Sequence, residues 1–410
     1  MSRDVLPGVW PMVFLPFALG YFLSYLLRTV NAVISPDLTA ELALSAADLG
    51  LLTSAYFLAF GLAQIPLGIA LDRFGPRRIN VALLMLAAFG SALFATGETM
   101  LELSLARALI GLGVSACLMS GLKAFSLWFP PQQQSSMTGF IMAAGALGAL
   151  TAATPVEAML PFLGWRGIFW AIAAVAACTA LYIALSVPET PPGGHRQTLG
   201  EALRSVGKIF TSSFFLRFAG GAMFFTGGFM ALQSLWAVPW LMHLDGLSRA
   251  QAAIFLVLLN LGMLTGQLSI GFFGTRLAHY GIQPLHLIRG GFCLVLVVEL
   301  LIVGRVGFSS ILWFVLGVLA AVNAQVYVAA ARFFPREAFG RVSTAINLMA
   351  FAGAFIVQWG LGIVLDVVDA AGHTPQTGLT IAFVLLISVQ AAALVPLLRG
   401  ARARGADQTN

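Results

Sequence analysis

GIALDRFGPRR, residues Gly68–Arg78, is a short polar stretch between two long apolar runs of the sequence. The runs cover residues 48–71 and 78–97, and each is long enough to cross a bilayer as a helix, which takes about 20 apolar residues. Two glycines, one acid and several arginines therefore lie together in a break between two predicted spans. Arginines in short breaks of this kind are typical of the cytoplasmic loops of membrane proteins.

The composition of the whole chain also indicates a membrane protein. Of its 410 residues 59% are hydrophobic and only 9% are charged, with a mean hydropathy of +0.93, whereas a soluble domain carries about 25% charged residues. The net charge of +6 is spread over short breaks, which excludes the clustered basic surface of a nucleic-acid-binding protein. Cys117, Cys178 and Cys293 lack paired spacing, so we expect no disulfide framework, metal site or cofactor.

The distribution of apolar runs predicts an all-α polytopic membrane protein, with twelve transmembrane helices in two pseudo-symmetric six-helix bundles. A polar linker at residues 188–212 separates an N-terminal bundle, residues 1–187, from a C-terminal bundle with a short cytoplasmic tail, residues 213–410. The predicted spans are residues 10–34, 48–71, 78–97, 102–129, 135–159, 166–187, 213–241, 249–274, 286–304, 309–333, 341–365 and 376–398.

The charges between the spans indicate the orientation of the chain. If the N-terminus lies inside, most arginines fall in cytoplasmic breaks, and the outer breaks keep only Arg166, Arg249 and Arg305. The positive-inside rule then places both termini in the cytoplasm. We expect the chain to be a multi-pass protein of a bacterial inner (plasma) membrane.

The two halves of the chain also resemble each other. Trp128-Phe129-Pro130 closes the fourth predicted span and Phe333-Phe334-Pro335 closes the tenth. A helix rich in small residues follows in both places. Internal repeats of this kind are typical of secondary transporters.

The break Gly68–Arg78 closely resembles the signature loop of the major facilitator superfamily, and Arg107-Ala-Leu-Ile-Gly111-Leu-Gly113 resembles that superfamily's second motif. The resemblance covers essentially the whole chain and implies a loop that latches the two bundles in the outward-open state. Glycines permit a tight turn and close approach, an acid suits a helix N-terminus, and arginines can bridge to helix C-terminal carbonyls. Simple solvation of a loop is the alternative. The predicted latch and gating residues are Gly68, Asp72, Arg73, Gly75, Arg77 and Arg107.

Arg28 lies deep in the first predicted span, where a charged side chain is costly and is therefore a functional candidate. Tyr21, Tyr25 and Arg28 are spaced to share one helical face. The pattern Tyr25-Leu-Leu-Arg28 followed by Pro36 resembles the first span of the organophosphate:phosphate antiporters and the anion:cation symporters. In those families the matching arginine binds the anionic group of the substrate, a task that suits the planar guanidinium. An arginine that reaches the outer headgroups is the alternative.

The resemblance further implies that the first, fourth, seventh and tenth spans line a central cavity. For the uncharged polar side chains on these spans, hydrogen bonding between helices is the alternative to substrate contact. For Lys123 two alternatives remain, because its side chain can reach the cavity or extend to the cytoplasm. The predicted substrate-binding residues are Arg28, Tyr25, Asn31, Lys123, Gln233, Trp236, Asn323 and Tyr327.

The sequence departs from both transporter families at informative positions. Ala231 stands where the antiporters place a second arginine in the seventh span, which favours a singly charged anion over a phosphate ester. The positions of the symporters' coupling acids hold Leu27 and Val114-Ser115. Three other acids lie in the predicted spans. Glu157 and Asp366 lie at the outer ends of their spans and are candidates for proton coupling, with simple solvation as the alternative. Glu299 lies deeper, and we expect it to pair with Arg305.

These patterns predict a secondary active transporter, not an enzyme, that moves a small organic anion such as a carboxylate by alternating access. Proton symport is an open possibility, and we expect a monomer whose partners are an anionic small molecule, the lipid bilayer and protons. Efflux of drugs or amphipathic metabolites by proton antiport is the alternative. The stretch Gly145–Gly148 opposes it, because it lacks the proline of the superfamily's antiporter motif. A membrane sensor would need a sizeable soluble domain, whereas the linker and tail are short.

Overall fold

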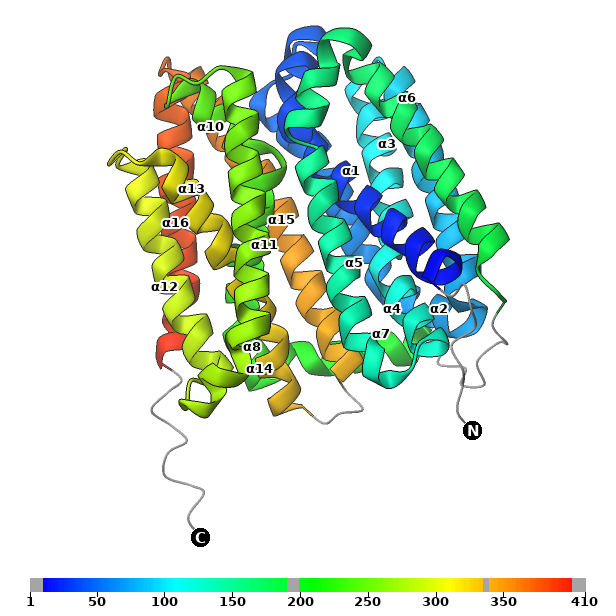
Figure 1. Cartoon of the computed structure of the whole chain (residues 1–410). Helices are drawn as coiled ribbons and strands as arrows, with labels where there is room; N and C mark the ends of the chain where they lie inside the picture. Colours follow the sequence, from blue (N-terminus) through cyan, green and yellow to red (C-terminus); the bar gives the residue numbers. More distant parts are fainter. Residues whose placement is uncertain (1–9, 190–198, 335–338, 400–410) are drawn as a thin grey trace.

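The computed structural model describes residues 10–189, 199–334 and 339–399, and all regular elements within these ranges are helices (Figure 1). The N-terminal half contains η1 (Trp10–Phe14), α1 (Leu15–Leu42), α2 (Ala46–Thr96), α3 (Met100–Val114), α4 (Cys117–Trp128), α5 (Pro131–Thr151) and α6 (Thr154–Ser186). The remainder contains α7 (Leu199–Phe210), α8 (Ser213–Gly221), η2 (Ala222–Thr226), α9 (Gly227–Ala231), η3 (Leu232–Trp236), α10 (Ala237–His243), α11 (Arg249–His279), α12 (Pro284–Val303), α13 (Ser309–Ala320), η4 (Ala321–Ala324), α14 (Gln325–Phe333), α15 (Phe339–Ala370) and α16 (Pro375–Arg399).

The helices account for the twelve predicted spans. Within the described ranges, ten helical stretches are long and apolar enough to cross a membrane. One of them, α2, has 51 residues and would be about 77 Å long if straight, more than twice the roughly 30 Å of a bilayer core. Gly75, with φ 79° and ψ 163°, breaks it into the second and third spans, a conformation that favours glycine. The shorter apolar helix Ser136–Thr151 within α5 provides the fifth span. The prediction of a twelve-span all-α fold is confirmed.

Three spans expected to line the cavity are interrupted helices. The fourth span is interrupted at residues 115–116 between α3 and α4, the seventh contains the π-helical turns η2 and η3, and the tenth contains the 3₁₀ turn η4. Such turns disturb the regular hydrogen-bond ladder and are frequent at functional sites. The fourth and tenth spans are both interrupted near their middle, which agrees with the internal repeat in the sequence.

The two halves of the chain lie side by side in Figure 1, with α1 to α6 on one side and α8 to α16 on the other. The halves meet where α2 packs against α15 and where α5 and α6 pack against α11. We call the end that carries Gly75 and α7 the inner end, and the opposite end the outer end. Residues 188–212 were predicted to be a polar linker, and the structure places α7 within them, in contact with both α2 and α15.

Candidate functional site

Arg28 lies near the middle of α1, in the region where the two halves meet, and only 7% of the residue is exposed. Its guanidinium carbon lies 4.4 Å from the ring centroid of Tyr25, 5.6 Å from that of Phe60 and 5.7 Å from that of Phe351. Phe60 belongs to α2 and Phe351 to α15, and their rings stack at 4.2 Å. Helices from both halves of the chain therefore enclose one cation.

The charge of Arg28 has no acidic partner in the described part of the chain. The ion pairs found in residues 10–189, 199–334 and 339–399 all involve other cations, and the buried Nε atom of Arg28 donates to no acceptor there. Aromatic faces attract a cation but do not neutralise it. Burying a charge without an ionic partner is costly, so Arg28 is the candidate of this region for binding an anion.

Tyrosine hydroxyls extend the polar character of the site. Tyr21 and Tyr25 contact each other edge to face, with ring centroids 5.1 Å apart. The Tyr56 hydroxyl donates to the Ser24 carbonyl oxygen at 3.1 Å, one turn before Arg28. Tyr327 of α14 donates its hydroxyl to Asn347 Oδ1 of α15. Of the two tyrosines predicted to contact substrate, Tyr25 therefore lies against Arg28, and Tyr327 joins α14 to α15.

Three of the other predicted substrate residues join helices in this conformation. Asn31 donates to Thr53 Oγ1 at 3.0 Å, Gln233 donates to Asn260 Oδ1 at 2.6 Å, and the Trp236 indole donates to the Gln358 carbonyl oxygen at 3.0 Å. All three are buried. In this conformation the three side chains therefore form hydrogen bonds between helices, which the sequence analysis gave as the alternative to substrate contact.

Asn323 is the last of the six uncharged predicted contacts. Its amide donates to the Ala320 carbonyl oxygen at 3.0 Å within the same helix turn, and its buried Oδ1 has no partner in the described ranges. Asn323 lies in η4, where the tenth span is interrupted. It therefore keeps a free acceptor at the break of a helix that is expected to line the cavity.

Lys123 extends toward the inner end and binds residues at the end of the second span. Its Nζ donates to Asp72 Oδ1 at 2.5 Å and to the Leu71 carbonyl oxygen at 2.8 Å. Asp72, which we expected to cap a helix N-terminus, pairs with this lysine instead. In this conformation Lys123 thus fastens α4 to the end of the second span.

The remaining loop residues take different positions. Arg77 donates to the Ala184 carbonyl in the last turn of α6, as expected for an arginine that bridges to a helix C-terminus. Arg73 lies over the ring of Phe74, with its guanidinium carbon 5.1 Å from the centroid. Gly68 lies in open space, with no described neighbour within 4 Å of the position its Cβ would occupy. A close approach at Gly68 is not made in this conformation.

Arg107 is almost fully buried and connects two helices of the first half. Its Nη1 donates to the Leu27 carbonyl oxygen at 2.9 Å, directly before Arg28, and its guanidinium carbon lies 5.1 Å and 5.6 Å from the ring centroids of Phe94 and Phe169. Arg107 therefore holds the α1 backbone at the residue that precedes the buried cation. This position suits the structural or gating role predicted for it.

At the outer end, polar bonds close the gap between the halves. Asp366 at the end of α15 accepts from the backbone N–H groups of Ala46 and Ala47 at 2.9 Å and 3.0 Å, which caps the N-terminus of α2. Arg249 of α11 pairs with Asp37 of α1. Glu157, the other candidate for proton coupling, is partly exposed in the first turn of α6. Asp366 is thus part of a contact that joins the two halves.

The sequence did not single out several residues of this site. Tyr56 and Phe60 carried a usable signal, because an aromatic pair at i and i+4 lies on one face of the second span. Phe351 carried none, since its contact with Arg28 depends on the packing of α15 against α2. In the described ranges, no three His, Cys, Asp or Glu side chains come together as a metal site.

Comparison with known sequences identifies the family. Residues 17–358 match the family described as the Major Facilitator Superfamily. The chain belongs to this superfamily. Membership indicates a transporter rather than an enzyme.

Three curated superfamily relatives share part of their sequence with this chain. It is 33% identical to a probable L-galactonate transporter of Escherichia coli K12 over 39% of this chain and 35% of that protein. It is 25% identical to the probable sulfoacetate transporter SauU of Cupriavidus necator over 46% and 44%, and 29% identical to the hexuronate transporter of Escherichia coli K12 over 39% and 37%. The matches thus span less than half the length of these relatives.

Solved structures show the superfamily fold over nearly the whole chain. The nucleoside transporter NupG superposes with a TM-score of 0.74 at 14% identity, covering 94% of this chain and 98% of that one. A bacterial homologue of the human lysosomal transporter Spinster superposes with a TM-score of 0.72 at 17% identity, covering 95% and 96%. At such identities the likeness concerns the fold alone.

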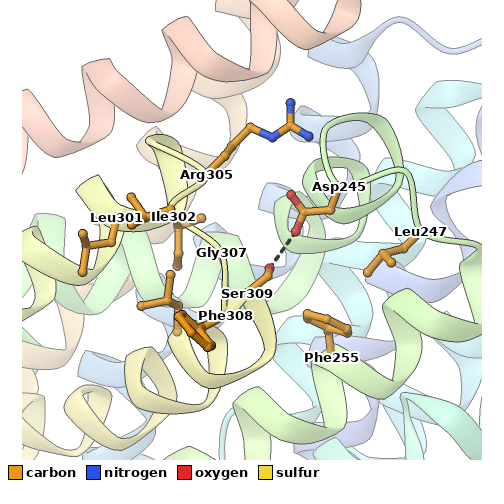
Figure 2. A pocket seen from close by; sticks show the side chains of 11 residues that line it. Asp245, Leu247, Phe255, Leu301, Ile302, Arg305, Gly307, Phe308 and Ser309 are labelled. Atoms are coloured by element: carbon orange, nitrogen blue, oxygen red, sulfur yellow. Dashed lines mark hydrogen bonds between the residues drawn. The ribbon is translucent and has the colours of Figure 1, made fainter.

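A separate pocket of about 300 Å³ lies at the outer end of the chain's second half. Figure 2 shows its lining, in which Asp245 accepts a hydrogen bond from Ser309 at 2.7 Å and Arg305 extends over the rim. None of the predicted substrate residues is among the described residues that line it. The pocket is therefore distinct from the region around Arg28.

Replacement of Lys123 by methionine tests its role. We expect Lys123→Met to lower the free energy of unfolding by about 1 kcal/mol or less, because Asp72 is 68% exposed and such ion pairs are weak. We also expect binding of an anionic ligand to be unchanged, since Lys123 is held at the inner end. Thermal unfolding with and without ligand measures both. A loss of ligand stabilisation in Lys123→Met but not in Asp72→Asn would instead make Lys123 a substrate contact.

Proposed function

We propose that this chain is a secondary active transporter that moves a small organic anion, a carboxylate or a similar singly charged group, across the bacterial inner membrane by alternating access. The observation that carries the proposal is Arg28, a buried cation without an acidic partner in the described ranges, enclosed by aromatic rings from both halves of the chain. Its guanidinium offers paired N–H donors to a carboxylate. An anion bound there would contact both halves at once.

The names of the relatives support an anionic substrate. L-galactonate, hexuronate and sulfoacetate, the compounds in the names of the three proteins, are all organic acid anions. The absence of a second arginine at Ala231 favours one charged group over a phosphate ester. Efflux of cationic drugs is disfavoured, because the site would repel a second positive charge.

The proposed mechanism uses the division of the chain into bundles 1–187 and 213–410, joined by residues 188–212, with both termini in the cytoplasm. The outer end is closed by Asp366 and by the pair of Arg249 and Asp37. Opening requires these bonds to break while the halves rotate about the region of Arg28. The loop Gly68–Arg78, in which Asp72 now pairs with Lys123, would latch the inner end in the opposite state.

A thermal-shift screen of the purified full-length protein tests the substrate class. We expect hexuronates, aldonates and small sulfonates to raise the melting temperature, and neutral sugars and cationic drugs not to. A ligand that binds only the folded state stabilises it by about 2.7 kcal/mol at a hundredfold excess over its dissociation constant. Stabilisation by cationic drugs alone would contradict the proposal and support efflux.

A further inference from the structure

Glu299 is a buried acid that the site around Arg28 does not use. It lies in α12 with 4% of its surface exposed, beside Gln390 of α16, which is fully buried. We expected Glu299 to pair with Arg305. In the structure its partner is Gln390, whereas Arg305 follows the end of α12 and lines the outer pocket of Figure 2.

The hydrogen bonds of this pair leave two acceptors without a donor. Gln390 Nε2 donates to Glu299 Oε1 at 3.3 Å and to the Phe224 carbonyl oxygen at 3.3 Å. Glu299 Oε2 and Gln390 Oε1 are both buried without a partner among the described residues. An ionised carboxylate and an amide oxygen can only accept. One proton on the carboxyl group would supply the missing donor to the pair.

The surroundings of Glu299 contain no cation that pairs with it in the described ranges. α12 packs against α13, α14, α16 and η4. On these elements the titratable groups outside α12 are Tyr327, which bonds to Asn347, Arg332, whose side chain lies outside the described residues, and Arg399 at the inner end of α16. On α12 itself Arg289 donates to the Leu397 carbonyl oxygen at the inner end. An unpaired carboxylate is costly within a membrane.

A second pocket at the outer end approaches this acid. Val303 of α12 and Thr380 of α16 line it together with His243 and Arg305. Val303 lies four residues after Glu299, which places it about one helical turn nearer the outer end. Water in this pocket would therefore lie about one turn from the carboxyl group of Glu299.

We propose that Glu299 and Gln390 form a proton-binding site, in which the carboxyl group of Glu299 carries the proton on Oε2 and Gln390 links it to the backbone of the seventh span. The link is the Phe224 carbonyl in the π-helical turn η2. Loss of the proton leaves a buried negative charge that attracts the amide group of Gln390. Because the same amide group donates to the Phe224 carbonyl oxygen, proton occupancy and the conformation of the seventh span are coupled. As the coupling-ion site of the transporter, this rests on the proposed function.

Infrared spectroscopy of the full-length protein in lipid tests proton occupancy directly. We expect a carbonyl stretch of a protonated carboxylic acid at neutral pH in the wild type and its loss in Glu299→Gln. The matched control is Glu157→Gln, which removes a partly exposed acid and should keep the band. Absence of the band in the wild type, or its persistence in Glu299→Gln, would overturn the proposal.

Transport in proteoliposomes tests coupling. With an anion that stabilises the wild type, we expect Glu299→Gln to keep ligand stabilisation and substrate exchange but to lose accumulation driven by a proton gradient at least tenfold. Exchange also shows that the variant folds. Accumulation equal to that of the wild type would refute coupling at Glu299 and leave Arg28 untouched. If no anion stabilises the wild type, the proposed function fails, whereas the infrared band still decides the proton site.

Discussion

Arg28→Gln is expected to abolish binding of the anionic substrate and to lower its transport at least thirtyfold. Removing one partner of a buried, hydrogen-bonded charge pair costs about 2–5 kcal/mol, and each 1.4 kcal/mol is about a factor of ten in affinity. Arg28 is the cation that aromatic rings from both halves enclose, whereas the buried Arg107 is held by the Leu27 carbonyl oxygen, so we expect no other side chain to replace Arg28. Uptake of labelled substrate into proteoliposomes measures the loss.

The fold of the Arg28→Gln variant should be intact or more stable without ligand, because an unpaired buried charge is removed. Arg28→Lys keeps the charge but not the planar fork, and we expect it to retain part of the binding. The matched control is Arg305→Gln, which removes an exposed arginine at the outer pocket and should transport like the wild type. Wild-type uptake by Arg28→Gln would refute the role of Arg28 as the anion anchor.

Asp366→Asn is expected to shift the protein toward an outward-open conformation. The carboxylate caps α2 through two backbone N–H groups, and hydrogen bonds to a charged group are worth about 1.5–3 kcal/mol each. Weakening this cap removes a bond that exists only while the outer end is closed, so the ratio of open to closed molecules should rise about tenfold or more. Labelling of a single cysteine placed on the outer part of α2 measures accessibility from outside.

Asp369→Asn is the matched control for this shift, since it changes the same residue type one turn further on, at an exposed position. It should leave accessibility unchanged. If Asp366→Asn labels no faster than Asp369→Asn, the cap does not hold the outer end closed. If the cysteine in Asp366→Asn is labelled as fast as in the wild type but the variant loses proton-driven accumulation, Asp366 is the coupling acid, as the sequence also allowed.

Close backbone contact also holds the outer end closed. A Cβ at Gly362 of α15 would lie 2.3 Å from the Ala46 carbonyl oxygen of α2, a distance that only glycine permits. This contact lies beside the cap made by Asp366. Asp366 and Gly362 thus belong to one contact between the two halves, although sequence patterns pointed to a different role for Asp366 and did not single out Gly362.

The sequence alone determined the class, the twelve spans and the place of the buried charge. Bilayer thickness fixes the length of a span, and the cost of a charge in lipid makes an arginine such as Arg28 conspicuous. The loop Gly68–Arg78 was recognisable because its turn needs glycine at a fixed position, and Gly75 has the positive φ that this implies. Such local constraints are written in short stretches of sequence.

Only the tertiary structure decided which polar side chains meet. Lys123 with Asp72, Asp366 with the start of α2, and Glu299 with Gln390 are separated in the sequence by 51, 320 and 91 residues. Helical periodicity gives the face on which each side chain lies, but not the helix that packs against that face. Hydrogen bonds and charges act over a few ångströms, so the partner of a buried polar group follows from packing and not from its own position in the chain.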